Sequence, residues 1–124
     1  MPSHLQSRSG YAAPAIRSER GTEYAAFARA TRQLRSLDQA DKRAFPRLAQ
    51  AVVDNQRLWA ALAEDLMHDD NALPLALRGQ LISLAEFVRR HSLAVLGGRA
   101  SVAPLVDINT AIMKGLRGDV EAAA

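Results

Sequence analysis

The 124-residue sequence contains no cysteine, which excludes disulfide bonds, thiolate metal ligands and cysteine nucleophiles. Aromatic residues make up only 5% of the chain, whereas alanine and leucine are abundant. This composition favours a packed helical protein over a sheet, which would be rich in Val, Ile, Thr and Tyr. A chain of this length is expected to form one domain with a modest core.

Long hydrophobic runs are also lacking. No segment approaches the roughly 18 consecutive apolar residues that would indicate a membrane span. The N-terminal segment has no apolar stretch of the roughly 7 to 15 residues that a signal peptide needs. We therefore expect a cytoplasmic protein that does not insert into a membrane.

The net charge of +3 is not concentrated in the part of the chain that is expected to fold. Residues 1–22 carry three arginines and one glutamate, and the remainder carries 13 basic and 12 acidic groups. The densest basic segment runs from Arg29 to Arg47 and is interrupted by Asp38 and Asp41. Because a nucleic-acid-binding protein usually gathers its basic groups on one face, we interpret this segment as a solvated helix face. A phosphate-binding patch is the alternative.

Hydrophobic periodicity predicts an all-α fold, a small bundle of about four helices. Residues 1–21 mix Ser, Gly, Pro, Ala and Arg without a period, so we expect a flexible tail there, with residues 1–18 disordered. Thr22 is a plausible N-cap for the first helix. The apolar stripe of this helix is narrow, which predicts that it is not deeply buried; it comprises Tyr24, Phe27, Ala28, Thr31 and Leu34.

The second and third helices carry the strongest periodic pattern. The second begins near Pro46, and its stripe is Leu48, Val52, Asn55, Trp59, Leu62 and Leu66. The third begins near Pro74 and ends at Gly97-Gly98, and its stripe is Leu77, Leu81, Leu84, Val88, His91 and Val95. When the residues of the second helix's stripe are paired with those of the third helix's stripe in reverse order, the two residue numbers of every pair add up to the same value. This predicts an antiparallel hairpin with Trp59 near Leu84 and Leu66 near Leu77.

A fourth helix is predicted after Ser101, whose side chain can cap it. Its apolar face comprises Val102, Leu105, Ile108, Asn109, Ile112, Met113 and Leu116. The helical domain is therefore expected to span residues 22–118, followed by a frayed C-terminus at residues 119–124.

The cluster His68-Asp69-Asp70-Asn71 has the residue types of a metal site, but it falls between two predicted helices. An imidazole favours the negative end of a helix, and acidic or amide side chains satisfy the free N–H groups at a helix start. The cluster also lacks a defined calcium-binding loop motif. We predict that these residues cap helix ends and that the protein binds no metal or cofactor.

Asn55 and His91 are polar residues within apolar stripes. Such residues often fix the register of packed helices, or they can point into a groove that a partner uses. No carboxylate, nucleophile or second histidine completes a catalytic set around His91, so no enzyme is predicted. Trp59 has the helical spacing of a core residue. The third helix has surplus apolar residues that a partner helix could cover, namely Ile82, Phe87, Leu93 and Leu96.

Four stretches together resemble a known family. They are RGTEYAAFARATRQL at residues 20–34, DNQRLWAALAEDL at 54–66, DNALPLALRGQLISLAEFVRRHS at 70–92 and APLVDINTAIMKGL at 103–116. The order N-x-R-L-W, D-N-x-L-P-x-x-L-R and D-I-N, at these distances, is similar to the FlaF family of bacterial flagellar biosynthesis regulators. Gln56 is a mild departure, since the family commonly has Asn-Arg-Arg-Leu-Trp.

The resemblance implies a small, helical, cytoplasmic protein without enzymatic activity or cofactor. Such a protein is needed for flagellin production and filament assembly, in the same pathway as the translational regulator FlbT. Two mechanisms remain open: binding flagellin as a secretion chaperone, or acting on flagellin messenger RNA directly or through an RNA-acting partner. The expected partner-binding residues are Asn55, Arg57, Trp59, Ile82, Phe87, Arg90, Asn109 and Met113.

Overall fold

The computed structural model describes the backbone of residues 12–123 and the side chains of residues 23–115. Within this range the chain forms four α-helices: α2 (Ala12–Arg35), α3 (Phe45–Leu66), α4 (Leu75–Leu96) and α5 (Ala103–Ala123). A short 3-10 helix, η1 (Lys42–Ala44), leads into α3. No strand occurs between residues 12 and 123, so the predicted all-α bundle is confirmed. No helix in the described part of the chain is long and apolar enough to cross a membrane.

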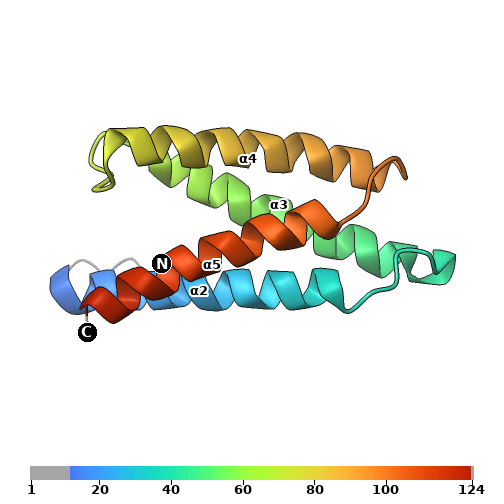
Figure 1. The fold of residues 1–124 in the computed structure, drawn as a ribbon, viewed down its shortest axis with the longest axis horizontal. Helices are drawn as coiled ribbons and strands as arrows, with labels where there is room; N and C mark the ends of the chain where they lie inside the picture. Colours follow the sequence, from blue (N-terminus) through green and yellow to red (C-terminus); the bar gives the residue numbers. More distant parts are fainter. Residues whose placement is uncertain (1–11, 124) are drawn as a thin grey trace, which may run out of the picture.

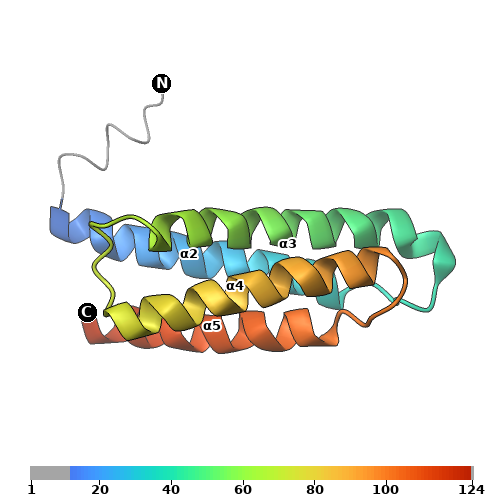
Figure 2. The same cartoon turned by 90° about the horizontal axis from the view of Figure 1, so that it is seen from above.

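The helices run up and down along one long axis (Figures 1 and 2). α2 packs along α5, α3 packs along α4, and α2 also packs on α3. α4 and α5 make little contact with each other, and Figure 1 shows them diverging from the loop that joins them. The interfaces α2–α5, α3–α4 and α2–α3 are therefore well packed, and the space between α4 and α5 is open at one end.

Both ends of the helical region extend beyond the sequence prediction. α2 begins at Ala12 and includes Thr22, so the prediction of Thr22 as the N-cap is wrong. Residues 12–18, which were predicted to be disordered, are helical. Pro14 is compatible with this start, because a proline in the first turn lacks only an N–H group that would be free anyway. Residues 1–11 lie outside the described range. At the other end α5 continues to Ala123, since its last residues include strong helix formers.

The core is formed by side chains from all four helices. α2 was predicted to be shallow, but Phe27 is 1% exposed and Leu34 is 0% exposed, because α3 and α5 cover its narrow stripe from two sides. The ring of Phe27 stands edge-on to Trp59, with ring centroids 5.5 Å apart and an interplanar angle of 84°. The other buried members of the main cluster are Leu48, Ala51, Val52, Val88, Val95 and Leu105.

α3 and α4 form the predicted antiparallel hairpin (Figure 1). Trp59 is buried in the core cluster and Leu84 packs against that cluster. The pair Leu66–Leu77 differs: Leu66 is fully buried, but Leu77 is 40% exposed. Leu77 was therefore wrongly predicted as a core residue. The physical reason is that α5 has already diverged from α4 at this end of the bundle (Figure 1).

The predicted stop at Gly97-Gly98 is confirmed. Gly98 has φ 75°, in the left-handed region, and its N–H donates to the carbonyl of Val95 at 3.0 Å. The N–H of Arg99 donates to the carbonyl of Ala94 at 2.8 Å. This pair of bonds is a Schellman motif, which uses glycine because a side chain is strained at positive φ.

The loops at this end of the bundle are tied together. The Gln39 amide donates to the carbonyl of Ala100 at 2.8 Å and accepts from the N–H of Val102 at 3.0 Å. Ser101 Oγ accepts from the N–H of Ala103 at 3.0 Å, so the predicted cap of the last helix is confirmed. One glutamine thus fixes the α2–α3 loop to the α4–α5 loop.

Two glycine substitutions test the geometry of the α4 C-terminus. We expect Gly98→Ala to lower the free energy of unfolding by roughly 1–2 kcal/mol, because alanine is strained in the left-handed region. Gly79→Ala is the matched control, since Gly79 lies inside α4 and an added Cβ meets no atom within 4 Å. It should raise the free energy of unfolding by roughly 0.5–1 kcal/mol. Urea denaturation measures both, and an unchanged Gly98→Ala protein would contradict the assigned backbone conformation.

Candidate functional site

A chain of hydrogen bonds between buried side chains joins α3 to α5. The indole Nε1–H of Trp59 donates to Asn109 Oδ1 at 2.8 Å, and Asn109 Nδ2 donates to Asn55 Oδ1 at 2.7 Å. All three side chains are buried, and Asn55 Nδ2 has no partner among the described residues. Asn55 and Trp59 are four residues apart in α3, so they point from the same face towards α5.

These three residues come from the N-x-R-L-W and D-I-N segments of the sequence. A buried amide or indole N–H is costly unless it is hydrogen-bonded, so the chain fixes the position of α5 against α3. Asn55, Trp59 and Asn109 were among the expected partner-binding residues, with a register role for Asn55 and a core position for Trp59 as the other interpretations; the structure places all three inside the bundle. A partner could reach Asn55 and Asn109 only if the helices separated, whereas one side of Trp59 borders a groove on the outside of α3.

The predicted capping by the His68–Asn71 cluster is wrong for its acidic members. α3 ends at Leu66, and α4 starts after Pro74 without a side-chain cap. Asp69 and Asp70 are exposed and make no side-chain hydrogen bond with the described residues. Among the residues that the structure describes, no group of His, Asp and Glu could hold a metal ion.

Asn71 and Arg78 stabilise the α3–α4 turn instead. The Asn71 amide donates to the backbone carbonyl and the carboxylate of Asp65 at 3.2 and 3.1 Å, and it accepts from the N–H of Leu73 at 3.0 Å. The Arg78 guanidinium donates to the carbonyl of Leu66 through Nε at 3.0 Å and Nη2 at 2.8 Å. Its Nη2 also reaches the carbonyl of His68 at 2.9 Å. Arg78 thus caps α3 from the first turn of α4.

Sequence reasoning missed the role of Arg78, although the residue was visible as the last position of D-N-x-L-P-x-x-L-R. The carbonyls at the end of a helix lack intrahelical partners, and a cation is favourable there. An arginine in the first turn of the following helix is well placed to reach them across a short turn. Asn71 and Arg78, the Asn and the Arg of the segment D-N-x-L-P-x-x-L-R, therefore both stabilise the α3–α4 turn.

A groove of about 500 Å³ lies between α3 and α4. It exists because alanines face each other across the seam, so that no large side chain fills the space. Its residues on α3 and just beyond are Gln56, Trp59, Ala60, Ala63, Glu64, Met67 and His68; those on α4 are Ile82, Ala85, Glu86, Val88 and Arg89. Trp59 and Val88 are otherwise buried, so the floor of the groove is the outer side of the core.

Exposed apolar side chains continue the groove at both ends. Met67 is 63% exposed at the turn end, and Leu75, the first residue of α4, is 79% exposed. Leu93, two turns beyond Glu86 on the same face of α4, is 49% exposed. A groove with exposed apolar side chains at both ends is typical of a surface that another protein covers.

The charged rim on α4 is partly neutralised internally. Glu86 accepts from Arg89 at 2.7 Å and lies 3.6 Å from Arg90 Nε. The hydrogen bond from Arg89 lowers the pKa of Glu86, which therefore remains ionised at neutral pH. Arg90, a predicted partner-binding residue, is exposed and takes part in this pairing.

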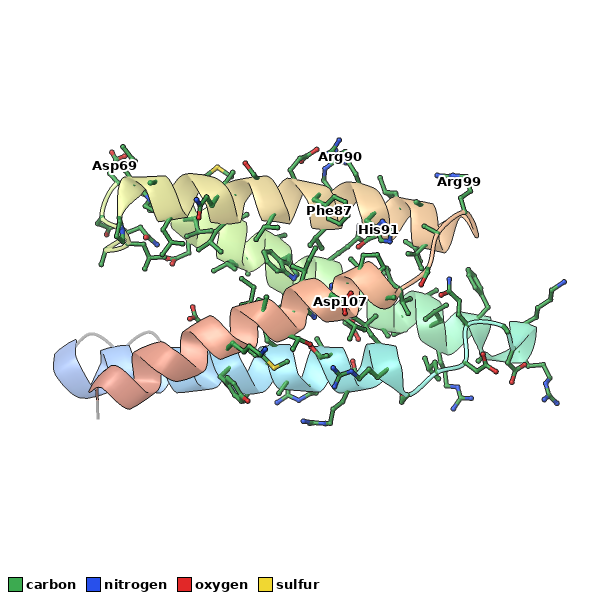
Figure 3. The ribbon with its side chains drawn as sticks, viewed as in Figure 1. Asp69, Phe87, Arg90, His91, Arg99 and Asp107 are labelled. Carbon is green, nitrogen blue, oxygen red and sulfur yellow. The ribbon has the colours of Figure 1, made fainter. Side chains whose placement is uncertain are left out.

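Phe87 and His91 lie on the other side of α4, towards the opening between α4 and α5 (Figure 3). Their rings are stacked, with centroids 5.3 Å apart and an interplanar angle of 18°. His91 Nε2 is 2.7 Å from the carbonyl of Ser101, so its tautomer with a proton on Nε2 donates to the α4–α5 loop. This contact gives His91 a structural role.

The structure does not bring the eight predicted partner-binding residues together. Ile82 lines the groove, whereas Phe87 faces the opening on the opposite side of α4. Arg57 is exposed on α3, and Met113 is half-buried against the core. The alanines that create the groove were not predicted, because the absence of a side chain carries no periodic signal.

The basic segment from Arg29 to Arg47 lies on α2, η1 and the first turn of α3, which are outside the groove. Arg29 and Arg32 are exposed. Arg35 donates to Thr110 Oγ1 at 3.4 Å, and Arg43 lies 3.3 Å from the carboxylate of Asp41. Part of the basic segment is therefore already engaged within the protein.

Replacing Asn109 tests the buried hydrogen-bond chain. Asn109→Ala removes the acceptor of the Trp59 indole and the donor to Asn55, leaving two buried polar groups unsatisfied. We expect the free energy of unfolding to fall by about 2–4 kcal/mol. Asp107→Ala is the control, because Asp107 is exposed on the same helix and should change stability by no more than about 0.5 kcal/mol. Equal stability of the two variants in urea would reject the assigned role.

The model of the family described as flagellar protein FlaF matches residues 7–116, which is most of the chain. The match includes the α3–α4 turn, the groove and the buried chain between α3 and α5. Neither a curated protein nor a solved structure matches the sequence.

Proposed function

The chain belongs to the FlaF family of flagellar proteins, and on this premise we propose that it binds flagellin in the cytoplasm as a secretion chaperone. In this role it keeps unassembled flagellin competent for export, and flagellin production and filament assembly depend on it. The observation that carries the proposal is the open apolar groove between α3 and α4.

The chemistry of the groove suits such a client. A subunit that polymerises through helices exposes apolar helical surface before assembly, and a chaperone must cover that surface. A groove between two helices binds an amphipathic helix by burying its apolar face. The apolar side chains at both ends, Met67 and Leu93, enlarge the area that such a helix can cover.

Regulation through flagellin messenger RNA is the second candidate. The exposed arginines of α2, Arg29 and Arg32, are the observation that favours it. RNA could be bound directly, or through an RNA-acting partner such as FlbT. The acidic residues Asp38 and Asp41 interrupt the basic segment, and the part of the chain after residue 22 has a net charge of only about +1 on the count of 13 basic and 12 acidic groups. These features favour flagellin as the ligand.

A salt series separates the two candidates. Binding that rests on apolar burial should change little between low and moderate salt. Direct binding to RNA should weaken by about 0.7 log units per log unit of salt for each phosphate neutralised. We expect the purified protein to bind the flagellin of the same genome with a nearly constant Kd, before and after ribonuclease treatment. Arg32→Glu should leave this Kd unchanged.

The reverse pattern would contradict the proposal. Steeply salt-dependent binding of flagellin messenger RNA, lost in Arg32→Glu and accompanied by no measurable binding of flagellin, would replace the chaperone function with the RNA-directed one. Isothermal titration or fluorescence anisotropy, performed on both ligands under the same conditions, gives the comparison.

A further inference from the structure

We propose that the groove between α3 and α4 receives one amphipathic helix of the client in a fixed direction. The N-terminal end of that helix lies over the α3–α4 turn and its C-terminal end lies over Arg89. This inference rests on the proposed function, because it takes flagellin as the client, and it adds the site, the class of ligand and the orientation.

The shape of the groove sets the size of the occupant. From Gln56 to Met67 the axis of α3 rises by roughly 16 Å, which is about three turns of helix. Ala60 and Ala63 on α3 and Ala85 on α4 leave the space between the helices free. Small residues on both walls let another helix approach closely, and the apolar floor requires an apolar stripe on that helix. The occupant is therefore a short amphipathic helix.

The charge around the groove changes sign along its length. Glu64 lines the groove near its turn end, and Asp65, Asp69 and Asp70 are exposed in the last turn of α3 and in the turn that follows, outside the lining. The one arginine at that end, Arg78, is held by the carbonyls of Leu66 and His68. Towards the other end lie three arginines, Arg57, Arg89 and Arg90; Glu86 pairs with the last two, which leaves an excess of positive charge there. Figure 3 shows Asp69 at the start of α4 and Arg90 well along it.

This polarity decides the orientation. A helix carries partial positive charge at its N-terminus and partial negative charge at its C-terminus. The complementary arrangement places the N-terminus of the occupant over the carboxylates and its C-terminus over the arginines. Basic side chains in the first turn of the occupant and acidic ones in its last turn strengthen the match. The same carboxylates repel phosphate, which disfavours a nucleic acid in this groove.

The first experiment asks whether the groove is the site. Ala60 lines the groove, and Ala61 is exposed on the same helix without lining it. We expect Ala60→Trp to weaken flagellin binding by roughly tenfold or more, because the indole occupies the space that the client helix needs. Ala61→Trp is the matched control and should bind as the wild type does. Both positions are exposed, so both variants should keep the thermal stability of the parent protein.

The second experiment asks for the direction. Because the sequence has no cysteine, one cysteine can be introduced at Met67 or at Leu93, which are exposed at opposite ends of the groove. A thiol-linked photoreactive group at each position is crosslinked to flagellin, and the products are mapped by mass spectrometry. We expect both positions to label one segment of flagellin. Position 67 should label residues that are N-terminal to those labelled from position 93.

The outcomes are distinguishable. If the wild-type protein does not bind flagellin, the proposed function fails. If the wild-type protein binds flagellin, the proposed function stands. If Ala60→Trp then binds flagellin as well as the wild type does and Phe87→Asp does not bind it, the site is the opening between α4 and α5. In that case only this inference fails. Labels in the reverse order overturn the orientation. Labels in unrelated flagellin segments overturn the single-helix occupant, as do labels confined to a second copy of this chain.

Discussion

The hydrogen-bond chain from Trp59 through Asn109 to Asn55 is the interaction on which the bundle depends. α5 has little contact with α4, so its place is set by packing on α2 and by this link to α3. Phe27 of α2 meets the edge of the same indole, so three helices converge on Trp59. Asn55 Nδ2 has no partner among the described residues, and a buried N–H group without a hydrogen bond costs free energy. A buried polar link fixes one register, where leucines alone would allow α5 to shift or rotate.

That link leaves the opposite side of α3 free to serve as a surface. The core face of α3 is anchored by α2 and α5, and its outer side forms one wall of the groove. Arg78 and Asn71 hold α3 and α4 together at the turn, and Gln39 ties the loops at the far end of the bundle. The groove therefore lies between two helices that are each held by contacts to the rest of the bundle. Such a surface can bind a helix without first being ordered, which lowers the entropic cost of association.

Sequence reasoning succeeded where the signal is local. The period of α3 and α4, the stop at Gly98 and the cap at Ser101 follow from residues that lie within a few positions of each feature. It failed where the cause is tertiary. Leu77 is exposed because α5 diverges, and the hydrogen-bond partner of Asn55 was not predicted because Asn109 comes from a helix 54 residues away. The groove could not be inferred, because the pairing that aligns the leucines places Ala60 opposite Ser83 and not opposite Ala85. The start of α2 at Ala12 could not be inferred either, because helix-forming alanines and arginines alternate there with Gly, Pro and Ser.

The exchange rate of the Trp59 indole N–H with solvent tests this account most directly. The chain has one tryptophan, so its indole proton gives a single resolved signal in a proton–nitrogen spectrum of the labelled protein. If the indole donates to Asn109 inside the core, its proton should exchange only when the bundle unfolds, as slowly as the most protected backbone amides. Exchange as fast as that of a solvent-exposed indole, while the backbone amides of α3 remain protected, would contradict the buried link.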